Sequence, residues 1–168
     1  VGPTGAGKSV LLALIALQFR RYPDAQVFAF DFGGSIRAAA LAMGGDWHDL
    51  GGSLTDGAAS SVSLQPLARV HETHERAWAA DWVAAILARE GVTITPEVKE
   101  HLWTALTSLA SAPLPERTLT GLAVLLQSND LKQALRPFCV GGAYGRLLDA
   151  ESEQLGEAAV QAFETEGL

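Results

Sequence analysis

Apolar residues run from Val10 to Phe19, interrupted only by Gln18, directly after a glycine-rich start. A run of this length and composition predicts a buried helix. Arg20 and Arg21 follow, and cations are favoured at the C-terminal end of a helix because they interact with its dipole. Pro23 then marks the point at which the helix is expected to have ended. The chain therefore begins with a helix that we expect to lie in a core.

A second apolar burst, at residues 26–31, shows no alternation and predicts a strand buried on both faces of a parallel sheet. The loop at residues 31–35 follows at its carboxyl end, and Ser35 is expected to cap a short helix that ends near Gly44. Two weaker strand candidates follow at residues 47–50 and 61–64, with a turn at residues 56–57 between them.

From residue 66 onward the apolar residues recur at helical spacing. The first helix is indicated by a stripe that consists of Trp78, Trp82, Ala85, Ile86 and Arg89, with Gly91 as its stop. A second helix begins after Thr95, a capping hydroxyl that precedes a proline and an acid. Its expected buried stripe consists of Leu102, Trp103, Leu106, Leu109 and Ala110. Further helices are expected at residues 119–127 and 130–135, and a last strand at residues 159–164.

The glycine-rich start is a complete G-x-x-x-x-G-K-[ST] phosphate-binding loop, which reads Gly2-Pro3-Thr4-Gly5-Ala6-Gly7-Lys8-Ser9. Its glycines allow a tight turn that brings backbone N–H groups against phosphate oxygens. Lys8 supplies a positive charge for the β- and γ-phosphates, and the Ser9 hydroxyl is a ligand for Mg²⁺. The dipole of the following helix favours the same anion. We therefore expect the loop, together with Val10, to bind ATP and Mg²⁺.

Composition fits a soluble globular piece of one domain, with 168 residues of which 48% are apolar and 18% are charged. The net charge of −7 argues against a broad nucleic-acid surface, because such surfaces are basic. No apolar run reaches the roughly 18 residues of a membrane span, and no signal peptide is evident. Cys139 is the single cysteine, which excludes an intrachain disulfide and fits a reducing cytoplasm.

Other candidate residues have a plain structural interpretation beside the chemical one. Asp31 ends an apolar strand, so it either contacts Mg²⁺ or bonds nearby backbone N–H groups; its place beside the nucleotide follows from the carboxyl end of the strand. The run from His71 to His74 is one residue too short for a zinc-binding H-E-x-x-H pattern and is expected to be a solvated helix start. Asp149 and Glu151 are expected to be exposed acids, and the tryptophans to be helical core.

Several segments together resemble the TrbE/VirB-type ATPases of conjugal transfer and type IV secretion systems, with TrbE as the nearest branch. They are the loop Gly2–Ser9, Phe28–Asp31, Glu75–Trp78, Arg117–Thr120, Tyr144–Glu151 and Phe163–Leu168. The resemblance covers essentially the whole chain. It implies an α/β fold: a partial RecA-like P-loop NTPase core with an inserted all-helical subdomain. Residues 1–65 would begin the core, residues 66–140 would form the subdomain, and residues 141–168 would return to the core.

The resemblance also implies an oligomeric ATPase, commonly a hexamer, in the cytoplasm and peripheral to the bacterial inner membrane. Its partners would be ATP and other type IV secretion components. Two features depart from the family pattern: Phe32 stands where a lysine is usual, and the Walker B acid is expected beyond Leu168. Since only Val1 precedes the loop, we interpret the sequence as a fragment of a longer protein.

Two other function classes remain open. One is a DNA-translocating motor of the coupling-protein or FtsK/HerA type, which shares the phosphate-binding loop but should present a basic surface. The other is a non-enzymatic interaction module in which the loop is only a structural anchor. Nucleotide binding with a salt series and DNA competition would distinguish these classes.

Overall fold

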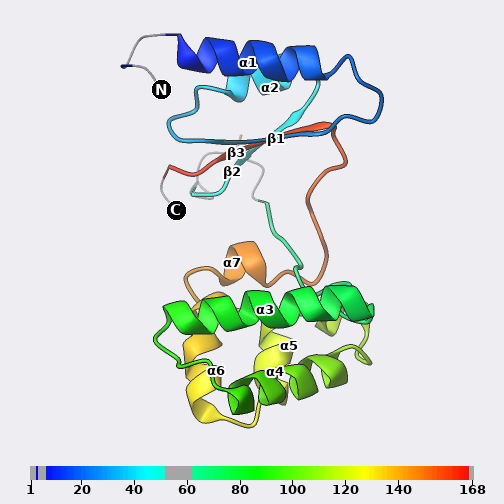
Figure 1. Ribbon diagram of the computed structural model, residues 1–168, viewed down its shortest axis with the longest axis vertical. Coiled ribbons are helices and arrows are strands. Elements are labelled where there is room, and N and C mark those ends of the chain that lie inside the picture. The colour runs from blue at the N-terminus through cyan, green and yellow to red at the C-terminus, as the bar shows by residue number, and fades with distance from the viewer. Residues whose placement is uncertain (1–2, 4–6, 52–61, 167–168) are drawn as a thin grey trace. The chain divides into compact units, whose positions relative to one another are not determined.

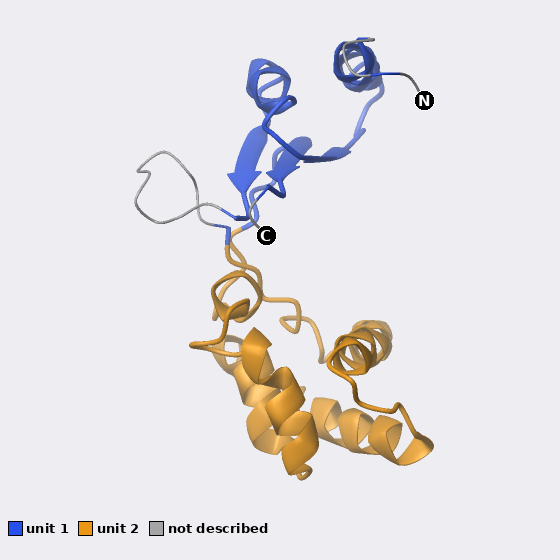
Figure 2. Cartoon of the chain, turned by 90° about the vertical axis from the view of Figure 1, so that its left-hand side faces the viewer, with its two compact units in different colours: residues 1–62, 155–168 blue, residues 63–154 orange. Residues whose placement is uncertain are grey.

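The computed structural model describes residue 3, residues 7–51 and residues 62–166, and these divide into two compact units. Unit 1 comprises residues 1–62 and 155–168, and unit 2 comprises residues 63–154 (Figure 2). Unit 1 contains a small parallel sheet with helices, whereas unit 2 is helical. The fold is therefore mixed helix and sheet, as an α/β protein requires.

The described residues of unit 1 form a sheet of three parallel strands in the order β1-β3-β2 (Figure 1). The strands are β1 (Val27–Asp31), β2 (Asp46–Asp49) and β3 (Val160–Glu164). These strands confirm the apolar burst at residues 26–31, the weaker candidate at residues 47–50 and the return strand at residues 159–164. β3 comes from the far end of the chain, yet it is the central strand and all five of its residues are buried.

Two helices of unit 1, α1 (Lys8–Phe19) and α2 (Arg37–Ala42), lie on one side of this sheet (Figures 1 and 2). Ala40 of α2 packs against Val160 and Ala162 of β3 in a small apolar core. Gly45 follows α2, and a Cβ atom there would lie 2.5 Å from the Val160 carbonyl oxygen. Glycine therefore lets the chain turn tightly past the central strand.

The expected burial of the first helix is wrong in the structure. None of the 12 residues of α1, all of which are described, is buried, and its large apolar side chains are 48–65% exposed. The helix itself lies where the apolar run predicts it. Its apolar side chains border an open cavity beside β1 in place of a packed layer.

The expected burial of the first strand on both faces is also wrong. Residues of β1 alternate: Val27 and Ala29 pack on the small core, whereas Phe28 and Phe30 are 53% and 73% exposed. β1 is an edge strand, so only one neighbour covers it. On this other face Phe30 stacks on Phe163 with ring centroids 5.1 Å apart, and His48 stacks on Phe163 at 5.2 Å. An aromatic row thus crosses all three strands.

Two smaller expectations in this region differ from the structure. Ser35 does not cap α2: the N-cap position is Ile36, because the Ser35 hydroxyl donates to the Asp31 carboxylate instead. Residues 62–64, which are described, form no strand. Ser61 and the expected turn at residues 56–57 lie outside the described residues.

Unit 2 packs short helices around one apolar core. They are α3 (Thr73–Arg89), α4 (Pro96–Leu109), η1 (Leu114–Glu116), α5 (Leu119–Leu125), α6 (Asn129–Leu135), η2 (Arg136–Phe138) and α7 (Gly145–Leu148). The expected helices at residues 119–127 and 130–135 correspond to α5 and α6. Hydroxyls cap three of the helices: Thr95 accepts from Val98 N, Thr118 from Gly121 N and Ser128 from Leu131 N. The Thr95 cap confirms the start expected from the Thr-Pro-Glu sequence.

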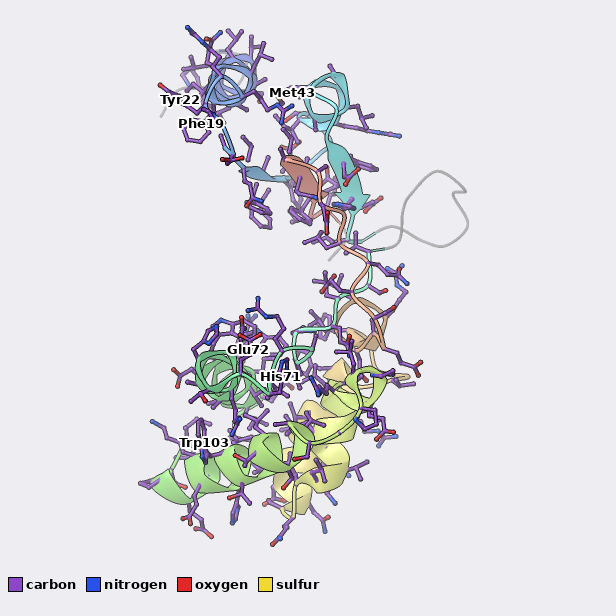
Figure 3. All side chains as sticks on the ribbon, turned by 90° about the vertical axis from the view of Figure 1, so that its right-hand side faces the viewer. Phe19, Tyr22, Met43, His71, Glu72 and Trp103 are labelled. Atoms are coloured by element: carbon purple, nitrogen blue, oxygen red, sulfur yellow. The ribbon has the colours of Figure 1, made fainter. Side chains whose placement is uncertain are left out.

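The core of unit 2 uses different faces of α3 and α4 from those expected. The buried residues of α3 are Ala79, Val83, Ile86 and Leu87, and those of α4 are Leu102, Ala105, Leu106 and Leu109. Trp78 and Trp103 are instead exposed by 49% and 42%. Trp78 stacks on Trp82 at 5.6 Å, and the Arg76 guanidinium lies over the Trp103 ring (Figure 3). The large rings therefore cover the core from outside, and smaller side chains fill it.

Asp149 is buried, in contrast to the expectation of an exposed acid. Its carboxylate accepts from the Thr120 N–H at 3.0 Å, from the Thr120 hydroxyl and from the Val140 N–H at 2.7 Å. Glu151 is exposed as expected. Within the described residues, no helix is both long and apolar enough to cross a membrane.

Candidate functional site

The N-terminus of α1 carries the described residues of the phosphate-binding loop. Gly7 has a φ of +75°, a conformation that favours glycine, and its carbonyl accepts from the Leu11 N–H as α1 begins. Lys8 and Ser9 are the first two residues of α1, and the Lys8 Nζ donates to the Pro3 carbonyl oxygen at 2.7 Å. The lysine side chain therefore lies back along the loop.

The remaining loop residues, Gly2, Thr4, Gly5 and Ala6, lie outside the described residues. Val10 is in the first turn of α1 and is exposed. The structure thus places the last three residues of the motif at the N-terminus of a helix, the position that a phosphate-binding loop requires.

A cavity of about 440 Å³ lies between α1 and β1. Its polar lining includes Ser9 at the start of α1, Asp31 at the carboxyl end of β1, and Ser35 in the loop that follows. The apolar lining comes from Leu12, Ile15, Ala16 and Phe19 of α1 and from Val27, Phe28, Ala29 and Phe30 of β1. Phe19 packs on Tyr22 at the far end of α1 (Figure 3). One cavity therefore brings together Ser9 and Asp31, the two sequence-predicted residues with oxygen donors.

The Asp31 carboxylate is held by the loop that follows it. The Ser35 hydroxyl donates to both carboxylate oxygens, at 2.9 and 3.0 Å, and the Ile36 N–H donates at 2.8 Å. Burial raises the pKa of Asp31, but the hydrogen bonds from Ile36 and Ser35 outweigh it and leave the pKa below its ordinary value. Asp31 is therefore a fixed anion, and its contacts are those of a strand-end aspartate that bonds nearby N–H groups.

Glu164, at the end of β3, is a residue that the sequence interpretation did not single out. Its carboxylate accepts from the Gly33 N–H at 3.1 Å, the Gly34 N–H and the Glu166 N–H at 2.8 Å. The hydrogen bond from Glu166 has the largest effect, and with those from Gly33 and Gly34 it lowers the pKa of Glu164 against the effect of burial. No local sequence signal identifies this role, because the glycines lie about 130 positions earlier.

All three strands end in an acid at the same edge of the sheet. Asp31 is in register with Glu164, and Glu164 is in register with Asp49. The Asp49 carboxylate also accepts a backbone N–H, that of Gly51 at 3.1 Å. Each carboxylate therefore holds a loop at the carboxyl edge, where ligands of parallel sheets bind.

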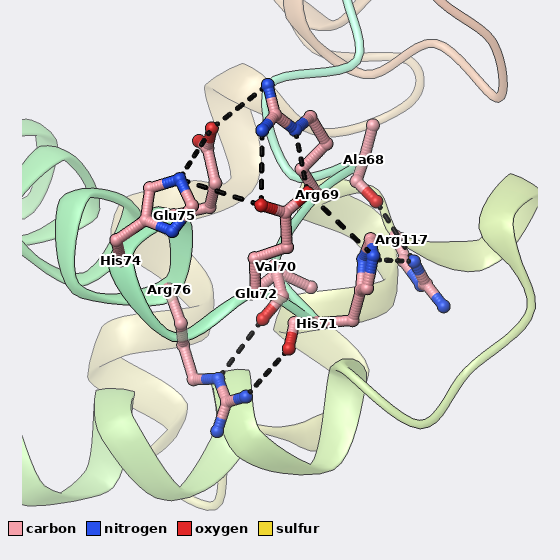
Figure 4. A network of polar contacts seen from close by, with 9 residues as sticks. All are labelled: Ala68, Arg69, Val70, His71, Glu72, His74, Glu75, Arg76 and Arg117. Atoms are coloured by element: carbon pink, nitrogen blue, oxygen red, sulfur yellow. Dashed lines mark hydrogen bonds and ion pairs between the residues drawn. The ribbon is translucent and has the colours of Figure 1, made fainter.

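The histidine-containing segment of unit 2 forms a network of ion pairs. Arg69 lies 3.0 Å from Glu72 and 3.2 Å from Glu75, and its hydrogen bond lowers the pKa of Glu72 (Figure 4). His74 Nε2 lies 3.6 Å from each of these carboxylates. Among the described residues, no group of three or more His, Cys, Asp or Glu is arranged to hold a metal ion.

Arginine side chains tie this segment to its surroundings. The Arg117 guanidinium donates to the Ala68 carbonyl at 3.1 Å and lies 2.8 Å from His71 Nδ1, and Arg76 donates to the carbonyls of Val70 and His71 (Figure 4). The segment is thus a structural junction of unit 2. Cys139 is half-buried, and its thiol donates to the Leu135 carbonyl.

Comparison with known proteins identifies relatives along nearly the whole chain. It is 44% identical over 167 residues, 99% of its length, to a probable conjugal transfer protein TrbE of Sinorhizobium fredii. It is 42% identical over 168 residues, again 99% of its length, to the conjugal transfer protein TrbE of Rhizobium radiobacter. The chain is homologous to a segment of TrbE. It spans 25% and 20% of the lengths of these two TrbE proteins.

Weaker similarity extends from this TrbE homologue to a second group of proteins. It is 24% identical over 158 residues, 92% of its length and 19% of the relative's, to the type IV secretion system protein virB4 of Bartonella henselae. No family model matches the chain. The relatives confirm the resemblance to TrbE and VirB-type proteins that the ordered motifs indicate.

Proposed function

We propose that this TrbE homologue contributes the ATP-binding segment of an oligomeric ATPase that energises conjugal transfer or type IV secretion. The observation that carries the proposal is the position of Gly7, Lys8 and Ser9 at the N-terminus of α1, with Ser9 and Asp31 on one cavity. The printed names of the relatives supply the process, conjugal transfer and type IV secretion.

The chemistry of the donors fits a magnesium nucleotide. Lys8 would hold the β- and γ-phosphates with its ammonium group, and the backbone N–H groups of residues 2–9 would bind the remaining phosphate oxygens. The Ser9 hydroxyl is an oxygen ligand of the kind that Mg²⁺ prefers. ATP would supply the phosphoanhydride bond, and Mg²⁺ would neutralise charge on its phosphates.

The arrangement of unit 1 supports a RecA-like core for this site. Parallel strands with helical crossovers form such cores, and ligands bind at their carboxyl edge. The helical unit 2 lies in the sequence between β2 and β3, as an inserted subdomain would. We assign the nucleotide to unit 1 and contacts with other subunits or secretion components to unit 2, with the assembly as a hexamer at the cytoplasmic side of the inner membrane.

The decisive variant is Lys8→Ala in the full-length protein, with Lys99→Ala on the exposed face of α4 as a charge-matched control. Loss of charge-assisted hydrogen bonds, worth about 1.5–3 kcal/mol, predicts nucleotide affinity that is roughly 10- to 100-fold weaker. Isothermal titration with ADP and Mg²⁺ measures the change. Lys99→Ala should bind like the parent, and equal affinity of Lys8→Ala and parent would refute the proposed site.

A further inference from the structure

The turn at Gly33 and Gly34 presents two backbone donors to one anion, the Glu164 carboxylate. The two glycines have φ values of +95° and +70°, which other residues rarely adopt. Successive N–H groups in such turns point to one side and form a concave site for an anion. The Gly33 N–H donates to Oε1 at 3.1 Å and the Gly34 N–H donates to Oε2. Both carboxylate oxygens therefore hold the turn.

The turn depends on the charge of Glu164 as well as on its size. Glu164 is 6% exposed, and its register neighbours, Asp31 and Asp49, are also acids. Burial and neighbouring like charges both disfavour an ionised carboxylate. The N–H donors offset these effects, and an amide at this position would have only one acceptor oxygen for the same donors.

The same strand end also fixes the residues on either side of the turn. Thr165, next to Glu164, donates to the Asp31 carbonyl from its N–H at 3.0 Å and from its hydroxyl at 2.7 Å. Asp31 precedes the turn and Ser35 follows it, and both line the cavity that Ser9 lines. The conformation of the turn therefore determines how these two side chains meet the cavity.

We propose that Glu164 is a positioning residue of the candidate nucleotide site. Its carboxylate holds Gly33 and Gly34 so that Asp31 and Ser35 face the cavity beside Ser9. Glu164 is absent from the described lining of that cavity, so it acts through the turn. The inference rests on the proposed function, because it assigns the cavity to a nucleotide.

The test compares Glu164→Gln with Glu157→Gln, which changes an exposed acid of the same unit, in the full-length protein. Hydrogen–deuterium exchange of the peptide that spans residues 31–37 reports on the turn without nucleotide. Isothermal titration with ADP and Mg²⁺ gives both the dissociation constant and the fraction of protein that binds. For Glu164→Gln we expect exchange about tenfold faster and a dissociation constant roughly three- to tenfold higher, as for one weakened hydrogen-bond set. Glu157→Gln should leave both unchanged.

The two readouts separate positioning from loss of folded protein. A smaller binding fraction at the parent's dissociation constant would mean that Glu164 only stabilises the fold, and would overturn the proposal. So would faster exchange without weaker binding, or no change in either. If Glu164→Gln does not fold, exchange in the parent decides: unprotected Gly33 and Gly34 amides refute the carboxylate contact. A parent that binds no nucleotide overturns the proposal too, but there Lys8→Ala also shows no effect, which identifies the proposed function as the cause.

Discussion

Two buried carboxylates, Asp149 and Glu164, organise the loops of their respective units by accepting backbone N–H groups. Their residue type gave no indication of this, because acids after a glycine-rich loop or at a strand end are usually exposed. Their donors lie 29 positions away for Thr120 and 131 for Gly33. A role that depends on such distant partners follows only from the tertiary structure. Lys8 and Ser9, in contrast, could be predicted, because one short segment contains the entire motif.

Asp149→Ala tests the first of these carboxylates. Its removal leaves the Thr120 and Val140 N–H groups without their acceptor, and we expect a loss of about 2–4 kcal/mol in the free energy of unfolding. Urea denaturation followed by tryptophan fluorescence measures the loss. Glu151→Ala, which removes an exposed acid two residues later, should change stability by no more than about 0.5 kcal/mol. Equal effects of the two substitutions would contradict the role assigned to Asp149.

Among the elements, those with a local signal were predictable and their exposure was not. The Thr95 cap with Pro96 gave the start of α4, and the apolar burst gave β1. The burial of α1 and of both faces of β1 was wrong, because burial depends on which other elements pack there. The stripe on α3 was wrong for Trp78, because a large ring covers the core edge while Ala79 and Val83 fill the interior. Helical spacing identifies a face only to within about one residue when apolar side chains occur all round.

The acids at the strand ends predict how unit 1 responds to pH. The pKa values of Asp31 and Glu164 are lowered in the folded protein, so the unfolded state binds protons more readily. Their contribution to stability is therefore fully present above the ordinary carboxyl pKa of about 4 and is lost as the pH falls through the lower folded values.

Urea unfolding midpoints measured between pH 7 and pH 3 should therefore fall at the acid end. Glu164→Gln has no carboxyl to titrate at this position, so its midpoints should depend less on pH than those of the parent. Glu157→Gln is the control and should follow the parent curve. A parent whose stability rises below pH 4 would contradict the assignment of these carboxylates.

At the scale of the whole molecule, the sequence predicted a parallel sheet and a helical segment between its strands. It did not predict that β3 would be central, since strand order depends on long-range pairing. The TrbE relatives are four to five times longer than the chain, which agrees with its interpretation as a fragment of a longer protein. Activity therefore belongs to proposals about that longer protein.

Residues 1–168 alone are expected to bind nucleotide without useful hydrolysis. Water activation needs a positioned acid, and the carboxylates of Asp31 and Glu164 already accept hydrogen bonds from their own loops. Phosphate release under multiple-turnover conditions tests this. Turnover that disappears in Lys8→Ala would show that a carboxylate of this chain is catalytic after all.

The central position of β3 has a consequence for the order of folding. β1 and β2 each pair with β3, and Val27 finds its partner at Val160, near the other end of the chain. A ribosome adding roughly 5–20 residues per second therefore exposes β1 and β2 for several seconds before their common neighbour emerges. Unit 2 is continuous in sequence and is complete earlier, at residue 154. We expect the helical unit to form first, while the exposed strands wait in a state that chaperones can bind.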